Sequence, residues 1–499
     1  MTSASLPLFD RAQRYGARTA ITTPTTSCSY AELLAGSAAI AGCLLDGRED
    51  LLEERVAFLV TPGADYVAVQ WGIWRAGGIA VPLCLSHPGA ELEYVVEDCG
   101  AAVVVADAAH LETARELAAV RGIRALSVRD AREGGTAELP RIEPSRRALI
   151  LYTSGTTSRP KGVVTTHANI EAQVTALVEA WEWSEDDRIL HFLPLHHIHG
   201  IINVLTCALW SGACCRMLPR FDAAGVWQEL LTQPLTLFMA VPTIYHRLIA
   251  AWREAAPESQ REMSAACRRL RLMVSGSAAL PVSTLEAWRE ISGHVLLERY
   301  GMTEIGMGLS NPLRGERRPG HVGVPLPGVE VRLVDEAGAP VPPGTPGEIE
   351  VRGPAVFREY WNRPEATAAA FRDGWFRTGD VAALEGGSYR ILGRSSVDII
   401  KTGGYKVSAL EIEEVLRTHP AIAECAVVGL EDPEWGERVG AALVLPPAAT
   451  LTLAELREWC RPRLAPYKIP TRLLLLDELP RNAMGKVTKP AVVHAFPGS

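Results

Sequence analysis

Short apolar segments alternate with amphipathic segments through the N-terminal part of the chain. The segments that fit buried strands are 56–60, 79–81, 101–106, 238–241, 270–275 and 295–297. Between the first two, residues 65–76 show helical periodicity and end at Gly77-Gly78, and glycine commonly terminates helices. Because buried strands that alternate with helices are typical of parallel sheets, we expect a large α/β domain.

The pattern changes after residue 322. Short alternating strands at 329–334, 347–352 and 389–392 are separated by turns rich in proline and glycine, such as 341–344. Alternation with a period of two and frequent turns is typical of antiparallel strands. We expect a small β-barrel over about 322–392 that closes the large domain.

The C-terminal part has an α+β pattern of its own. Helices are predicted at 409–418 and 453–462, and strands at 423–430 and 471–476. A chain of 499 residues is also longer than one hydrophobic core usually supports. We therefore expect an N-terminal domain, 1–394, and a small C-terminal domain, 395–499, joined near Ser395-Ser396.

Composition narrows the class of protein. The net charge is −8 and no basic stripe occurs, so we expect no nucleic-acid partner. No apolar run reaches the roughly 20 residues that span a bilayer, and the N-terminus lacks the order of a signal peptide. The ten cysteines are scattered, which favours reduced thiols in the cytoplasm, or in the mitochondrial matrix if a transit peptide precedes this chain. No pattern indicates an oligomeric state.

Residues 152–162 have the chemistry of a polyphosphate-binding loop. They follow the apolar run 148–151 and combine hydroxyls, glycines and cations, which can surround phosphate oxygens. The candidate phosphate contacts are Thr153, Ser154, Gly155, Thr156, Thr157 and Lys161. Pro160 and Gly162 stand where a Walker A loop needs glycine and Ser/Thr, so a P-loop kinase is disfavoured. The alternative is a solvated turn.

This loop resembles the phosphate-binding signature of the adenylate-forming superfamily, which includes acyl-CoA synthetases, luciferases and the adenylation domains of peptide synthetases. Four further segments match that family in order, namely 276–278, 298–304, 374–380 and 480–486. The resemblance therefore covers nearly the whole chain. Two residues depart from the family pattern: Ser158 replaces a usual glycine, and Ser396 replaces the usual Asp or Lys of the hinge.

The resemblance implies a role for each matching residue. Tyr300 would stack on adenine, Thr303 would contact the α-phosphate, and Glu304 would hold Mg²⁺. Asp380 would accept the ribose hydroxyls with help from Arg394. The remaining residues that it places in the nucleotide site are Gly276, Ser277, Glu298, Gly301 and Met302.

The resemblance also implies a two-step mechanism. A carboxylate attacks the α-phosphate of ATP, with Lys486 stabilising the developing charge, and a thiol then displaces AMP. The C-terminal domain would be a mobile lid that rotates about Ser396 between the steps. The residues that would then reach coenzyme A are Lys401, Gly403, Gly404 and Tyr405.

Arg299 points to the acid that is activated. Relatives acting on fatty or aromatic acids commonly carry a small glycine at this position, and a guanidinium beside an acyl pocket is costly unless an anion meets it. A second substrate carboxylate would be such a partner. Further candidate substrate contacts are Ser275, His199 and His197, of which His197 is also a candidate catalytic residue. Arg247 is a weaker candidate, because it can also lie on an exposed helix face.

Arg299, the histidine run 196–199 and the segment 301–307 together resemble malonyl-CoA synthetases. The resemblance implies malonate or methylmalonate, ATP and coenzyme A as substrates, with Mg²⁺. Four alternatives stay open: Arg299 paired with a protein carboxylate, a short-chain monocarboxylate synthetase, an enzyme that loads a carrier-protein thiol, and a nucleotide-binding protein without activity. We expect no zinc at the histidines, since no nearby cysteine or carboxylate completes a site.

Overall fold

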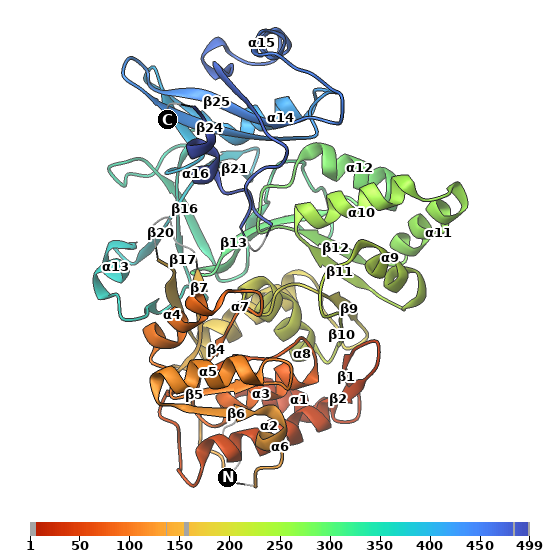
Figure 1. Ribbon diagram of the computed structural model, residues 1–499, viewed down its shortest axis with the longest axis vertical. Coiled ribbons are helices and arrows are strands. Elements are labelled where there is room, and N and C mark those ends of the chain that lie inside the picture. Colours follow the sequence, from red (N-terminus) through yellow and green to blue (C-terminus); the bar gives the residue numbers. More distant parts are fainter. Residues whose placement is uncertain (1–5, 136, 154–158, 483–484, 498–499) are drawn as a thin grey trace.

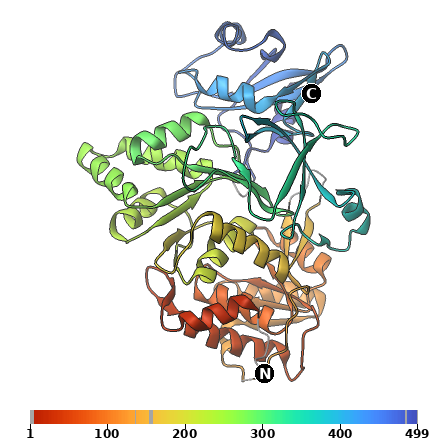
Figure 2. The same ribbon diagram turned by 180° about the vertical axis from the view of Figure 1, so that it is seen from behind.

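The structure is a computed structural model that describes residues 6–135, 137–153, 159–482 and 485–497. The N-terminal part of the chain, with α1 to α8, lies at the bottom of Figure 1, the segment with α9 to α12 lies to one side, and the C-terminal part lies at the top. Figure 2 shows the same three parts from behind. No helix among the described residues is long and apolar enough to cross a membrane.

The first sheet has seven strands and is mostly parallel. Its order is β18 (Glu359–Tyr360), β8 (Lys161–Thr166), β7 (Arg147–Thr153), β4 (Ile79–Pro82), β3 (Arg55–Leu59), β5 (Val103–Ala106) and β6 (Arg124–Ser127). Only the pairs β18–β8 and β8–β7 are antiparallel. The connecting helices are α3 (Ala64–Arg75), α4 (Gly89–Cys99) and α5 (Leu111–Arg121). The predicted parallel α/β arrangement is confirmed.

The second sheet has nine strands. Its order is β15 (Val324–Pro325), β14 (Gly306–Ser310), β13 (Leu297–Met302), β12 (Leu272–Ser275), β11 (Leu237–Ala240), β9 (Arg188–His191), β10 (Cys214–Met217), β1 (Thr19–Thr22) and β2 (Ser27–Ser29). The pairs from β13 through β1 are parallel.

The prediction of a strand at 295–297 was wrong in its bounds. The strand begins at Leu297 and continues to Met302, because its backbone pairs with β12 on one side and with β14 on the other. Residues 298–302 of the motif thus lie within the sheet. The predicted strand 270–275 likewise begins only at Leu272.

Helices of the large domain pack on both sheets. They are α1 (Pro7–Tyr15), α2 (Tyr30–Leu45), α6 (Val128–Arg132), α7 (His167–Ala180), the π-helix η1 (His199–Thr206), α8 (Cys207–Ser211), α9 (Ala223–Thr232), α10 (Pro242–Glu254), α11 (Pro257–Arg268) and α12 (Val282–Ser292). One apolar cluster includes Phe58 of the first sheet and Leu237 of the second, together with Trp71 and Trp181. The two sheets therefore share one core.

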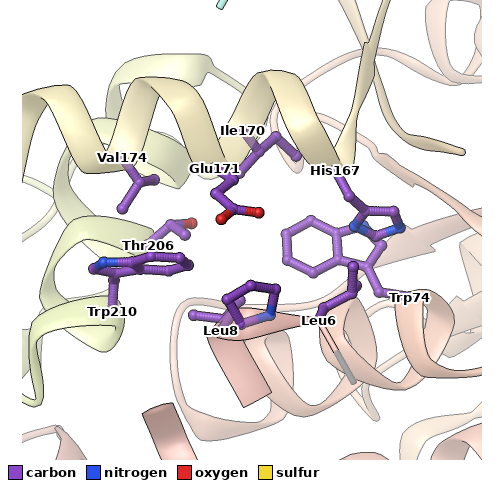
Figure 3. Close-up of a pocket in the computed structure, with 10 residues that line it drawn as sticks. Leu6, Leu8, Trp74, His167, Ile170, Glu171, Val174, Thr206 and Trp210 are labelled. Atoms are coloured by element: carbon purple, nitrogen blue, oxygen red, sulfur yellow. The ribbon is translucent and has the colours of Figure 1, made fainter. Parts of the chain in front are cut away.

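A small, partly open pocket of about 30 Å³ lies at the border of this core, between α1 and α7 (Figure 3). Trp74 and Trp210 line it, and the side chain of Glu171 lies between them in the close-up. A space of that size holds only a water molecule or two. None of its lining residues belongs to the predicted site, so this pocket is a packing feature.

The predicted small barrel is a five-stranded antiparallel sheet. Its order is β16 (Glu330–Val334), β17 (Gly347–Arg352), β20 (Trp375–Glu385) and β19 (Phe371–Arg372), and β21 (Ser388–Arg394) also pairs with β20. Among the described residues these pairings do not close into a ring, because β16 pairs with no strand other than β17. The short helix α13 (Pro364–Ala369) precedes β19.

The C-terminal part, which we call the lid, comprises the elements between residues 399 and 495 and is a sheet with helices on both faces. Its strands are β23 (Tyr405–Ser408), β22 (Ile399–Thr402), β25 (Gly436–Val444) and β24 (Glu424–Asp432), with β26 (Arg472–Leu475) beside β25. Its helices are α14 (Ala409–Arg417), α15 (Leu453–Cys460), the 3₁₀-helix η2 (Pro466–Lys468) and α16 (Lys489–Ala495). Two apolar clusters, one on each sheet face, consist of lid residues.

The α+β pattern predicted for this part is confirmed, with small differences in the bounds of its elements. The predicted helix 453–462 ends at Cys460, since Pro462 cannot donate a backbone hydrogen bond. The predicted division at residue 394 stays a prediction, and the turn 395–398 between β21 and β22 is compatible with it.

Candidate active site

The predicted substrate residues lie where parallel strands of the second sheet end. Ala240 and Ser275 end β11 and β12 and pair in register, and Ser275 pairs in turn with Glu298 near the start of β13. This edge is where open α/β sheets bind ligands. Ser275 is fully buried there, and its Oγ has no hydrogen-bond partner among the described residues. The edge therefore presents polar groups that the described chain itself does not satisfy.

Arg299 is the strongest of these groups. Only 4% of it is exposed, and its Nη1 and Nη2 donate to Ser277 Oγ at 3.3 and 3.4 Å. Its Nε has no partner, and no carboxylate among the described residues pairs with the guanidinium. Burial lowers the pKa of Arg299 to about 9. The alternative in which a protein carboxylate neutralises Arg299 is therefore wrong for the described chain.

The loop before α12 is shaped around this guanidinium. A Cβ at Gly276 would lie 2.5–2.6 Å from three guanidinium atoms of Arg299, so any larger residue would displace the guanidinium from its present position. Ser277 has a left-handed backbone, with φ of 68°, which costs a non-glycine residue about 1 kcal/mol or more. Its Oγ contacts both Arg299 and His199 Nδ1, the latter at 3.2 Å. These contacts offset the strain, and they place Gly276 and Ser277 beside the substrate candidates.

His199 is the first residue of the π-helix η1, and His197 lies two residues before it. A π-helix is a rare geometry that often marks functional sites. Burial lowers the pKa of His197 to about 2 and that of His199 well below its usual value. Both imidazoles are therefore neutral. Nε2 of His199 is buried and has no partner among the described residues, so it can bond to a ligand.

Lys486 enters the site from the lid. Its backbone N donates to Asn482 Oδ1 at 3.1 Å, and Arg481 and Val487 form a β-bridge, so the described residues before and after 483–484 lie close to each other. Burial, together with the cations Arg299 and Arg394, lowers the pKa of Lys486 to about 8, and Asp380 opposes this shift. The lid lysine thus lies within electrostatic reach of the substrate and nucleotide candidates.

Asp380, Arg394 and Tyr300 form one cluster. Arg394 Nε donates to Asp380 Oδ1 at 3.0 Å, and Tyr300 Oη donates to Asp380 Oδ2 at 2.6 Å. The predicted nucleotide residues are therefore brought together. Both carboxylate oxygens already have partners, so a ribose would have to replace or share these hydrogen bonds. Stacking of Tyr300 on adenine stays a prediction.

Glu304 and Thr303 occupy the turn that follows β13. Tyr360 Oη donates to Glu304 Oε1 at 2.9 Å, and Lys161 Nζ lies 5.2 Å from the centroid of the Tyr360 ring. Burial raises the pKa of Glu304, and the Tyr360 hydrogen bond opposes this. Sequence reasoning missed Tyr360, because its partner is 56 residues away and no local pattern indicates the contact.

Only part of the predicted phosphate loop belongs to the described residues. Thr153 ends β7 opposite Lys161, whereas Ser154, Gly155, Thr156 and Thr157, with Ser158, lie outside the described residues.

Glu298, another predicted nucleotide residue, lies in β13. It accepts a hydrogen bond from Leu280 N at 3.2 Å, and burial raises the pKa of its carboxyl group to about 8.

Two other predicted nucleotide residues belong to β13. Gly301 lies at its irregularity opposite β14, where a Cβ would meet Gly306 O at 2.2 Å, and Met302 ends the strand.

The predicted coenzyme A residues belong to the lid. Lys401 is in β22 and Tyr405 in β23, with Gly403 and Gly404 in the turn between them. Tyr405 is 54% exposed and stacks on Tyr467 at 4.2 Å between ring centroids. Ser396 is exposed in the turn 395–398. The coenzyme A and hinge roles stay predictions.

One further sequence interpretation concerns Arg247. It is exposed on α10, so its role as a substrate contact is not supported. No group of three or more His, Cys, Asp or Glu side chains that could hold a metal ion occurs among the described residues, and the absence of zinc at the histidines stays a prediction.

Comparison with known proteins identifies relatives over nearly the whole length. The chain is 49% identical to "Malonate--CoA ligase ACSF3, mitochondrial" of Mus musculus, an alignment that covers 98% of this chain and 90% of the relative. Among solved structures, ATP-bound MatB from Rhodopseudomonas palustris superposes with a TM-score of 0.91 at 34% identity, and 99% of each chain is covered. Apo MatB from the same organism gives a TM-score of 0.81 over the same coverage.

Two family models divide the chain between them. The model of the AMP-binding enzyme matches residues 8–361, and that of the AMP-binding enzyme C-terminal domain matches residues 411–486. The first match covers more than half of the chain and includes the Arg299 site, and the second ends at Lys486. The chain therefore belongs to the AMP-binding enzyme family.

Proposed function

We propose that this chain is an AMP-forming ligase that joins malonate to coenzyme A at the expense of ATP. The single observation that supports this most is Arg299, a buried guanidinium with no carboxylate partner among the described residues. A buried unpaired cation is costly unless a ligand neutralises it. The distal carboxylate of malonate is such a ligand, and malonate is the acid named for the mouse relative.

In the first step, the distal carboxylate binds Arg299, which Ser277 orients through its Oγ. The other carboxylate attacks the α-phosphorus of ATP, a P–O bond forms, and pyrophosphate leaves. Lys486 supplies positive charge as negative charge builds up on the phosphoryl oxygens. The neutral imidazoles of His197 and His199 provide hydrogen bonds without adding charge.

Mg²⁺ fits this site through Glu304. The residue offers one buried carboxylate whose Oε1 already accepts from Tyr360, and Mg²⁺ commonly uses only one or two protein carboxylates together with phosphate oxygens. When bound, the ion would neutralise phosphate charge. Glu304 is the only protein ligand that we assign to it.

In the second step, the thiol of coenzyme A attacks the carbonyl carbon of the adenylate, its proton is lost, and AMP leaves. For this step we propose a lid rotation about Ser396 that withdraws Lys486 and brings 401–405 to the thiol. The higher similarity to ATP-bound MatB than to apo MatB supports the view that the present lid orientation serves the first step.

The test is an AMP-release panel in which coenzyme A is combined with malonate, methylmalonate, succinate, acetate or butyrate. We expect the highest kcat/KM with malonate and appreciable turnover of methylmalonate, since one methyl group changes binding by only about 1–3 kcal/mol. Butyrate turnover equal to that of malonate would establish a monocarboxylate synthetase instead. Absence of acid-dependent pyrophosphate release would indicate a nucleotide-binding protein without activity.

The thiol acceptor and the compartment complete the proposal. Replacing coenzyme A with a phosphopantetheinylated carrier protein in the same assay distinguishes a ligase from a carrier-loading enzyme.

All ten cysteines are free, which fits a reducing compartment, and we propose the cytoplasm. The mouse relative is named as mitochondrial, so fractionation of the native cells should compare cytoplasm with matrix.

A further inference from the structure

The helix α12 begins without a cap from its own sequence. The residue before it, Pro281, provides no side-chain hydrogen bond, although the first N–H groups of a helix need acceptors. Val282 N instead donates to Glu414 Oε2 at 3.2 Å, and Glu414 belongs to α14 of the lid. A carboxylate at this end of a helix is also favoured by the helix dipole. The lid thus provides the cap that the large domain lacks.

This contact meets the loop that shapes the substrate pocket. Residues 276–281 connect β12 to α12, and they include Ser277, which holds Arg299, and Leu280, whose N–H bonds to Glu298. The Glu414 carboxylate therefore touches the far end of the same loop. A change in lid orientation that removes Glu414 leaves the start of α12, and so the end of this loop, without its acceptor.

Inside the lid, Glu414 is held by a chain of ion pairs. Arg417 bonds to Glu414 Oε1 at 2.6 Å and to Glu413 Oε2 at 3.0 Å. Lys489 then joins Glu413 Oε1 at 2.9 Å to Asp398 Oδ1 at 2.5 Å. This series of ion pairs therefore connects the carboxylate that caps α12 to Lys489 and Asp398.

At one end of this chain, Asp398 Oδ2 accepts the backbone N–H of Arg394 at 3.0 Å, next to the turn 395–398. At the other end, Lys489 begins α16, three residues after Lys486. Ion pairs and a hydrogen bond thus connect the Glu414 carboxylate to the residues beside the predicted hinge and to the helix that follows Lys486.

We propose that Glu414 is a positioning residue for adenylate formation: by capping α12 it stabilises the lid orientation that keeps Lys486 in the site. The proposal rests on the two-step function and the lid rotation proposed above. Rotation of the lid carries α14 away from α12 and breaks the hydrogen bond. The contact therefore favours the first half-reaction and opposes the lid rotation that the second half-reaction needs.

The first test separates the two half-reactions in the full-length protein. Glu414→Ala should lower malonate-dependent ATP–pyrophosphate exchange about fivefold, which corresponds to the roughly 1 kcal/mol of a helix cap. Thioester formation from synthetic malonyl-adenylate and coenzyme A should be unchanged or faster. Glu414→Gln keeps an acceptor oxygen without the charge and should lose less exchange activity.

The matched control is Glu411→Ala. Glu411 lies on the same helix, but its carboxylate pairs with Lys468 inside the lid at 2.6 Å. This variant should leave the ratio of the two half-reactions at the wild-type value. If Glu414→Ala slows both half-reactions equally, or leaves the exchange reaction unchanged, Glu414 does not position the lid.

A second measurement does not depend on the substrate. Hydrogen–deuterium exchange of the amides at the start of α12, above all Val282, should be faster in Glu414→Ala than in the wild type and in Glu411→Ala. Equal amide exchange in all three proteins would overturn the proposed role of Glu414. If the wild type shows no malonate-dependent pyrophosphate exchange but the protection of the α12 amides depends on Glu414, the substrate assignment fails and the contact between Glu414 and α12 stands.

Discussion

Two lysines three residues apart on the lid have opposite surroundings. Lys489 is buried between Asp398 and Glu413, and these carboxylates raise its pKa against the effect of burial. Lys486 forms no ion pair among the described residues, and burial together with Arg299 and Arg394 lowers its pKa to about 8. A buried charge with partners holds a structure together, whereas a buried charge without partners is typical of a site that binds a ligand of opposite charge.

The same contrast separates whole regions of the molecule. The ion-pair chain in the lid satisfies each of its charges with a protein group. The substrate edge of the large domain leaves Arg299 without a carboxylate, and the lid adds Lys486 to it. Malonate and ATP would bring the missing negative charge. The predictions below test this difference, beginning with the largest expected effect.

Removing the unpaired lysine should abolish most activity without affecting stability. Lys486→Ala should reduce malonate-dependent pyrophosphate exchange by about 10²–10³-fold, the usual effect of deleting one charge-stabilising donor. The melting temperature should stay within a few degrees of the wild type, because no protein partner loses its ion pair. Lys406→Ala, at an exposed position of the lid, is the control. An exchange rate within threefold of the wild type would remove Lys486 from the mechanism.

Removing the paired lysine should have the opposite result. Lys489→Met leaves Asp398 and Glu413 buried without their cation, which should destabilise the lid by about 3–5 kcal/mol in denaturant unfolding. Lys406→Met breaks only the exposed pair with Glu336 and should leave the unfolding midpoint almost unchanged. Equal losses in the two variants would contradict the distinction between buried and exposed pairs.

The pH dependence of the first half-reaction should report the pKa of Lys486. The lysine is a cation below pH 8 and loses its charge as the pH rises through about 8, so kcat/KM should fall about tenfold per pH unit above that value. Bound ATP and malonate are anions that raise the pKa of Lys486, so kcat at saturation should fall only at higher pH. In Lys486→Arg the fall in kcat/KM should occur at a higher pH, because the guanidinium keeps its charge. A kcat/KM that stays constant to pH 9.5 would contradict the assignment.

The smallest effect concerns Tyr360. Tyr360→Phe removes the hydrogen bond that favours the ionised form of Glu304, so the pKa of Glu304 should rise further. Apparent affinity for Mg²⁺ in the exchange assay should weaken about 3–10-fold, which corresponds to the roughly 1 kcal/mol of one intramolecular hydrogen bond. Tyr467→Phe, on the lid surface, should have no effect. Unchanged Mg²⁺ dependence would show that Tyr360 does not support a metal ligand.

Apolar segments made much of the fold predictable. The strands expected at 56–60 and 79–81 differ from β3 and β4 by one residue, because a buried parallel strand is apolar along its whole length. The strand at 295–297 was misplaced for the converse reason: β13 contains Glu298, Arg299 and Gly301, which local propensity excludes from a strand. Closure of the predicted barrel depends on pairing at a distance, which no local pattern specifies.

The site was predictable where the family motifs run and not elsewhere. Asp380, Arg394 and Tyr300 were expected together and do form one cluster. Tyr360 and Glu414 were not expected, since their partners lie 56 and 132 residues away in the sequence. The left-handed backbone of Ser277 was also unexpected, because it depends on Arg299 and His199 as tertiary partners.

The central claim is that Arg299 binds the second carboxylate of the substrate. A cycle of wild type and Arg299→Leu, each with malonate and with butyrate, measures this coupling directly as kcat/KM for pyrophosphate exchange. We predict a loss of about 100-fold or more with malonate, the effect of stranding one buried charge, and a gain or little change with butyrate. Arg247→Leu, on an exposed helix face, should change neither. Equal losses with both acids in Arg299→Leu would contradict the claim.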